Sequence, residues 1–71
     1  METVIIDLDE KKKYRNAFYF LSIERIIMEE LEVDDYFNMC IYDKDIMITS
    51  DNKEIIDGLN SLLSEVEDEN D

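Results

Sequence analysis

The chain has 71 residues, of which 20 are acidic and 7 are basic, so its formal net charge at pH 7 is −13. A chain of this length forms one domain and buries only about 60% of the surface that its unfolded state exposes. Because it contains one cysteine and no histidine, the sequence excludes an internal disulfide and a zinc site of ordinary composition.

The first predicted element is a strand over residues 3–8, where β-branched apolar residues alternate between two faces. A helix is predicted over residues 10–32, because apolar residues recur there at the helical spacing. Its main apolar face carries Ala17, Phe20, Leu21, Ile27, Met28 and Leu31. A second apolar strip on the far side consists of Tyr19, Ile23 and Ile26, and we interpret this strip as a surface for self-association.

Residues 36–49 are predicted to form a β-hairpin with Asp43 and Lys44 as its two-residue tip. This register places Phe37, Met39, Ile41, Ile46 and Ile48 on one face of the sheet. Cys40, Tyr42 and Met47 fall on the other face, together with Ile5. A second helix follows, which Asp51 is predicted to cap, since Glu54 stands three residues later at the spacing of a capping box. Its apolar face carries Ile55, Ile56, Leu59, Leu62, Leu63 and Val66.

The element order β-α-β-β-α predicts an α+β fold, in which two helices pack on one face of a small three-stranded sheet. We expect residues 1–64 to form this domain and residues 65–71 to be a frayed or disordered acidic C-terminal tail. No stretch approaches the 18 apolar residues of a membrane span, and neither end resembles a targeting segment. The single thiol favours a reducing compartment, so we expect a cytoplasmic protein that makes no contact with membranes.

The segment Asp7-Leu8-Asp9, at the end of the first strand, resembles the first motif of the haloacid dehalogenase-type phosphatases over about six residues. That motif continues into Gly-Thr, whereas this chain has Glu10 and Lys11. We therefore interpret the segment as a junction between strand and helix, in which Asp7 or Asp9 caps the first helix.

Other chemical motifs are weaker still. Cys40 has no histidine to activate it as a nucleophile, and no sheltered pair of carboxylates is evident. Residues 43–54 lack the alternating oxygen ligands and the central glycine of an EF-hand loop. The basic segment 11–15 is outweighed by a charge that repels phosphate, which argues against direct binding of nucleic acid. We therefore predict a protein that is not an enzyme, with no catalytic, cofactor-binding or metal-binding residues.

The acidic residues are unevenly distributed along the chain. Residues 1–28 hold five acids and five bases, whereas residues 29–71 hold fifteen acids and two bases and so carry the whole net charge of −13. Without residues 65–71, which contain five acids, the net charge of the rest is still −8. The candidate partner-binding residues on loops and polar faces are Glu29, Glu30, Glu32, Asp34, Asp35, Asp43, Asp45, Glu54 and Asp57.

This charge predicts a small inhibitor protein that imitates nucleic-acid phosphates and blocks a basic DNA- or RNA-binding host protein by stoichiometric binding. Residues with AT-rich codons (Phe, Tyr, Met, Ile, Asn and Lys) number 31, whereas Gly, Ala, Arg and Pro number 4. That usage is typical of a low-GC genome and favours a phage or mobile-element product acting in the host cytoplasm. Candidate targets are a restriction enzyme, a CRISPR nuclease or a transcription factor.

The alternative is a homodimeric structural or regulatory interaction module, whose acidity serves only solubility.

Overall fold

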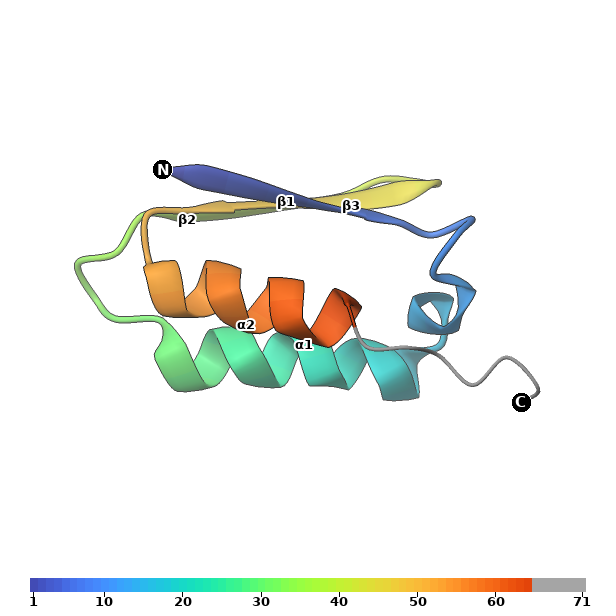
Figure 1. Ribbon diagram of the computed structural model, residues 1–71, viewed down its shortest axis with the longest axis horizontal. Coiled ribbons are helices and arrows are strands. Elements are labelled where there is room, and N and C mark those ends of the chain that lie inside the picture. Colours follow the sequence, from blue (N-terminus) through green and yellow to red (C-terminus); the bar gives the residue numbers. More distant parts are fainter. Residues whose placement is uncertain (65–71) are drawn as a thin grey trace.

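The computed structural model describes residues 1–64, in which a three-stranded antiparallel sheet is covered on one face by two helices (Figure 1). The elements are β1 (Glu2–Asp7), the 3-10 helix η1 (Lys12–Arg15), α1 (Ala17–Glu30), β2 (Phe37–Ile41), β3 (Asp45–Ser50) and α2 (Lys53–Leu63). The predicted α+β fold is confirmed, with η1 as an additional short element. The predicted acidic tail and Val66 lie outside the described residues.

β3 is the central strand of the sheet, and the spatial order is β1-β3-β2. In the hairpin, Ile41 lies opposite Ile46 and Met39 lies opposite Ile48. The amide of Tyr42 donates a hydrogen bond of 2.8 Å to the carbonyl of Asp45, which closes the turn. The predicted hairpin register is therefore confirmed.

The outer face of the sheet lies on the side away from both helices (Figure 1). Ile5, Met47 and Cys40 form one row across the three strands, and Ile5 is 60% exposed. A hydrogen bond with Cys40, together with the nearby charge of Asp45, raises the pKa of Tyr42 above its ordinary value.

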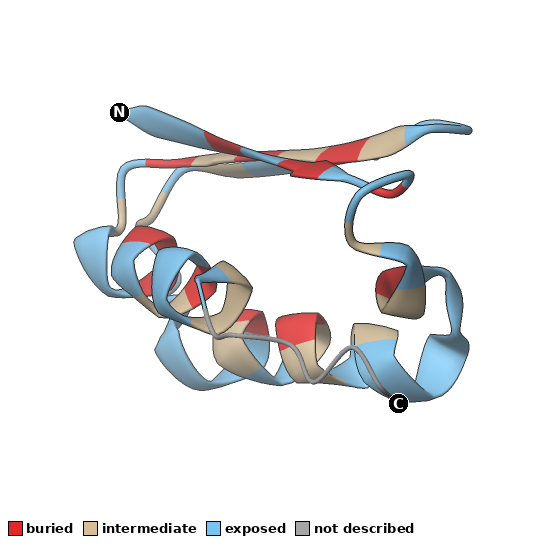
Figure 2. Cartoon of the chain, turned by 45° about the vertical axis from the view of Figure 1, so that its right-hand side comes forward, coloured by how far each residue is buried: buried red, intermediate tan, exposed pale blue. Residues whose placement is uncertain are grey.

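The core lies between the sheet and the helices, where the buried positions face one another (Figure 2). Its buried hydrophobic residues are Val4, Ile6, Leu8, Tyr14, Ile23, Ile27, Ile46, Ile48, Ile55, Ile56 and Leu59. The two helices approach each other closely at Gly58, where an added Cβ would lie 3.0 Å from Cγ2 of Ile26. Glycine at this position therefore allows α2 to pack against α1.

The first helix begins later than predicted, because Asn16 rather than an aspartate caps it. The Asn16 side chain accepts a hydrogen bond of 2.8 Å from the amide of Phe18, and its extended backbone interrupts the helical path. The predicted capping by Asp7 or Asp9 is wrong. Asp7 instead accepts the amide of Asp9 at 2.9 Å in a turn, and Asp9 forms an ion pair of 3.2 Å with Arg15.

The second helix also begins one residue later than predicted. The side chain of Asn52 accepts the amide of Ile55 at 3.2 Å, so Asn52 is the N-cap. The predicted cap, Asp51, instead accepts the amide of Tyr36 at 3.0 Å. Asp51 therefore joins the segment before β2 to the end of β3, and its carboxylate does not cap α2.

The structure divides both predicted apolar strips of the first helix between core and surface, because Ile27 of the predicted main face is buried and Phe20 packs against the core as expected. Ile23 is fully buried and Ile26 is half-buried against α2, so these two residues of the predicted self-association strip belong to the core, whereas Tyr19 is 43% exposed. Leu21 and Met28 were expected in the core, yet they are 54% and 80% exposed. The position of α2 decides this, because the helical spacing alone fits either strip.

Candidate functional site

Two connections of the chain meet at one end of the molecule: residues 31–36, between α1 and β2, and residues 51–52, between β3 and α2 (Figure 1). The start of β1 lies there too, because Glu2 pairs with Ser50. We call this region the acidic end. Its charged residues are Glu2, Glu29, Glu30, Glu32, Asp34, Asp35, Asp51, Glu54 and Asp57, with the single base Lys53.

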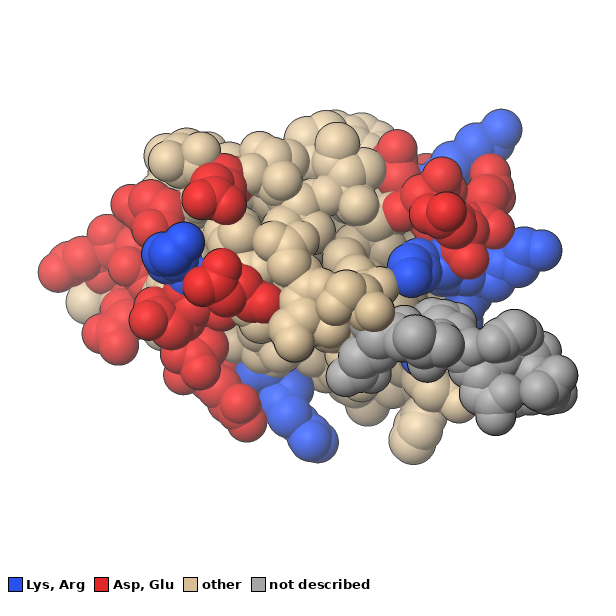
Figure 3. All heavy atoms as spheres, in the orientation of Figure 1, with Lys and Arg blue, Asp and Glu red and all other residues tan. Residues whose placement is uncertain are grey.

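Within residues 1–64, the net charge is concentrated at this end. The described residues contain fifteen acids and seven bases, a net charge of −8. The acidic end holds nine of these acids and one base, which is also −8, so the rest of residues 1–64 is neutral. Acidic side chains accordingly crowd the left side of the space-filling view (Figure 3). The fold therefore gathers the charge onto one surface.

Asn52 organises the acidic end by making hydrogen bonds to three separate segments. Its Nδ2 donates to the backbone carbonyl of Glu30 at 2.8 Å and to Oδ2 of Asp35 at 2.6 Å. Its Oδ1 caps α2 through Ile55, and its own amide donates to Oγ of Ser50 at 3.0 Å. One side chain thus ties the end of α1, the following loop and the start of α2 together.

Two of the carboxylates have structural roles in the loops. Asp35 accepts the amide of Glu32 at 2.8 Å in addition to its bond from Asn52, and Asp51 accepts the amide of Tyr36. Each carboxylate accepts hydrogen bonds from protein groups instead of water, so these bonds hold the loops in one conformation. The acidic surface is therefore preorganised before any partner binds.

The remaining carboxylates of the loops and the α2 N-terminus point outward. Glu30, Glu32, Asp34 and Glu54 are exposed, and they border a shallow hollow of about 670 Å³. Lys53 lies 3.9 Å from Asp57 in an exposed pair, a contact that contributes little to stability. The hollow thus presents several carboxylates and one weakly held cation to a partner.

Several acids occupy positions that disfavour folding. Glu29 and Glu30 lie in the last turn of α1, where the helix dipole is negative, and Glu32 follows closely. Each charge there costs about 0.3–1 kcal/mol at low ionic strength. Glu54, in the first turn of α2, is the favourable case. Helix stability alone therefore does not explain why the acids gather at this end.

We expect Asn52→Asp to destabilise the fold by about 1–3 kcal/mol. Aspartate caps a helix as well as asparagine does, so this loss reports the two Nδ2 hydrogen bonds and a new repulsion with Asp35. Urea denaturation followed by circular dichroism measures it. Asn60→Asp, an exposed substitution on α2 that adds the same charge, is the matched control. Equal midpoints for the two variants would contradict the role assigned to Asn52.

The structure divides the predicted partner-binding residues between two places. Seven of the nine lie at the acidic end, which Glu2 and Asp51 also join. Asp43 and Asp45 lie at the opposite end, at the hairpin tip (Figure 1). Glu2 was not predicted to belong to this surface. Its position there depends on the pairing of β1 with β3, for which the sequence gives no local signal.

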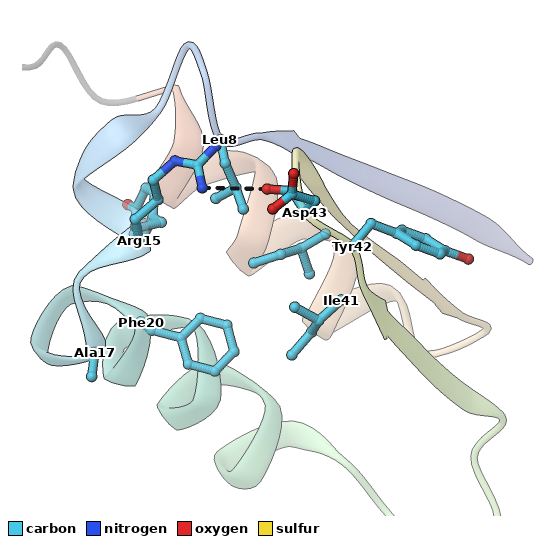
Figure 4. Close-up of a pocket in the computed structure, with 9 residues that line it drawn as sticks. Leu8, Arg15, Ala17, Phe20, Ile41, Tyr42 and Asp43 are labelled. Carbon is cyan, nitrogen blue, oxygen red and sulfur yellow. Dashed lines mark hydrogen bonds between the residues drawn. The ribbon is translucent and has the colours of Figure 1, made fainter.

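We call the opposite region the hairpin end. Its charged residues are Asp7, Asp9, Glu10, Asp43 and Asp45 with Lys11, Lys12, Lys13, Arg15 and Lys44, and their charges cancel. Arg15 donates to the Asp43 carbonyl at 3.3 Å beside an apolar hollow of about 400 Å³ (Figure 4). Phe20 of α1 and Ile41 of β2 face each other across this hollow. Within residues 1–64, the two ends therefore differ sharply in charge.

The acidic end can offer a partner charge and hydrogen-bond acceptors. Within residues 1–64, no group of three or more Asp, Glu or Cys side chains is placed to hold a metal ion. Neither helix in this part of the chain has the length and apolar character needed to cross a bilayer. Comparisons with protein-family models, with curated proteins and with solved structures find no match to the chain.

Proposed function

We propose that this protein is a stoichiometric inhibitor, whose acidic end occupies the basic cleft of a nucleic-acid-binding protein. The observation that carries the proposal is the net charge of −8 on one preorganised end, while the other charges of residues 1–64 cancel. The narrow cross-section of the molecule is 22 × 19 Å. A 22 Å length of DNA carries roughly a dozen phosphate charges, so the two charge densities are comparable.

Solubility alone is a weaker explanation of this charge pattern. A soluble protein needs net charge, but it gains nothing from placing that charge on one surface. Spreading the same carboxylates over the surface would lower their mutual repulsion. The unfavourable positions of Glu29 and Glu30 at the end of α1 add to this cost. A directional field that steers a basic partner accounts for the concentration of charge.

The proposed inhibitor acts by binding, without catalysis. The amino-acid usage supports a phage or mobile-element origin and a place of action in the host cytoplasm. On this proposal the target is a host nuclease, such as a restriction or CRISPR effector, or a transcription factor. These proteins share a basic cleft that attracts phosphates, and the acidic end would compete for it.

The proposal is tested by capture and competition. Immobilised protein is incubated with lysate of a low-GC bacterium, and the captured proteins are identified by mass spectrometry. We expect a nucleic-acid-binding protein that added DNA or RNA displaces, with affinity that falls steeply as salt rises. A ternary complex of target, nucleic acid and this protein would overturn the mimicry mechanism.

A further inference from the structure

β2 is an edge strand without the features that normally protect an edge. In a chain with 38% charged residues, its five residues, Phe-Asn-Met-Cys-Ile, include none. Natural edge strands are usually shielded by charges, prolines, bulges or covering elements. The opposite edge, β1, follows that rule, with Glu2 and Asp7 at its two ends. The β2 edge is therefore suited to pairing with another strand.

An apolar flank of α1 lies next to this edge. Phe20 of α1 and Ile41 of β2 line the same hollow, and Ile41 is 61% exposed (Figure 4). Each residue advances about 100° around a helix, so Leu21 lies beyond Phe20 on the flank away from α2. Met28 is seven residues further along that stripe, and both side chains are exposed. The open strand edge and the hollow between Phe20 and Ile41 thus belong to the same side of the molecule, whereas Leu21 and Met28 line a separate hollow with Glu24, Arg25 and Glu29.

We propose that a second copy of this chain covers that side, with β2 pairing antiparallel to β2 of the second copy about a two-fold axis at Met39. The two sheets then form one six-stranded sheet. Phe37 lies two residues before Met39 and Ile41 lies two residues after it, and both are on the inner face of the sheet. Phe37 of each copy therefore lies opposite Ile41 of the other copy. The Phe37 of the second copy then lies at the mouth of the hollow beside Ile41.

The charge distribution favours this orientation. β2 runs from the acidic end, which precedes Phe37, to the hairpin end, which follows Ile41. Antiparallel pairing places each acidic end beside the hairpin end of the second copy, which contains five of the seven basic residues and whose charges cancel within residues 1–64. Parallel pairing would bring two ends of −8 together, at a high electrostatic cost. The acidic ends of the dimer stay far apart and remain open to partners.

The register is tested by thiol cross-linking in a Cys40→Ser background, with a short bis-maleimide as the reagent. Met39→Cys should cross-link to itself, because residues at the two-fold axis lie directly opposite each other, about 4.5–5.5 Å apart. Phe37→Cys and Ile41→Cys should each cross-link poorly alone but efficiently when mixed. Efficient self-linking of Phe37→Cys, with none for Met39→Cys, would overturn this register.

Mass measurement by light scattering over the micromolar range tests the dimer itself. We expect twice the chain mass of 8.5 kDa, and Ile41→Lys should weaken dimerisation by more than about tenfold, since the two-fold axis introduces two lysines. Ile5→Lys is the matched control, because Ile5 is equally exposed on the opposite edge strand. A mass of 8.5 kDa throughout, or a dimer insensitive to Ile41→Lys, would overturn the inference. A monomer would mean that the β2 edge is available to a strand of another protein. Neither result tests the proposed binding by the acidic end.

Discussion

Leu59→Ala is expected to remove most of the stability of this domain. Leu59 is fully buried on α2, the helix that packs against both β1 and α1. Truncating such a leucine removes apolar burial and leaves a cavity, at a cost of about 2–5 kcal/mol. A chain of this size has a total unfolding free energy of roughly 4–10 kcal/mol. The variant should therefore be partly unfolded at moderate temperature.

Urea denaturation monitored by circular dichroism measures this loss. Val33→Ala is the control, because Val33 is 97% exposed in the loop after α1 and a surface substitution changes stability by less than about 0.5 kcal/mol. If Leu59→Ala shifts the midpoint no more than Val33→Ala does, α2 does not pack as described.

The elements with one strong pattern were predictable from the sequence. α2 has a single apolar face, so its buried residues Ile55, Ile56 and Leu59 were identified correctly. The hairpin register was also predictable, because strict alternation allows one arrangement in which Ile46 and Ile48 both face the core. These features depend on contacts that are local or periodic along the chain.

The first helix shows where periodicity is insufficient. Its residues are apolar on two sides, and the position of α2 against Ile26 buries Ile23 beside Ile27. Leu21 and Met28, also predicted to lie in the core, are exposed. Its start was also misplaced, because the basic segment 11–15 has good helix propensity whereas Asn16 caps the helix after it. Tertiary contacts and one capping side chain outweighed the local pattern in both cases.

The acidic surface was half predictable. The change in charge after residue 28 was visible in the sequence, and seven of the nine candidate acids do lie together. Asp43 and Asp45 were assigned to the same surface although the length of the hairpin separates them from it. Glu2 was missed because its neighbours come from residues 50–53, across the β1–β3 pairing. The positions of these acids therefore depend on the order and direction of the strands in the sheet, which the charge pattern of the sequence does not show.

Reversing three carboxylates of the acidic end should abolish binding to the captured target. The variant Glu32→Lys, Asp34→Lys, Glu54→Lys changes exposed side chains only, and it spares Asp35 and Asp51, whose hydrogen bonds hold the loops. It reduces the charge of the acidic end from −8 to about −2, so we expect affinity to fall by more than about a hundredfold. Calorimetric titration against the target measures this change.

A second triple reversal, Glu10→Lys, Asp43→Lys, Asp45→Lys, is the matched control at the hairpin end. Both triple variants raise the total charge of −13 by the same six units, so attraction through net charge alone predicts equal losses of affinity. Mimicry by the acidic end predicts a loss of less than about threefold for the control, because its changes lie outside the binding surface. Unfolding midpoints of both variants should stay near that of the unmodified chain, since five of the six substituted side chains are exposed and the sixth, Asp45, is only half-buried. Equal weakening by the two variants would show that the position of the carboxylates is irrelevant and would support solubility as the reason for the acidity.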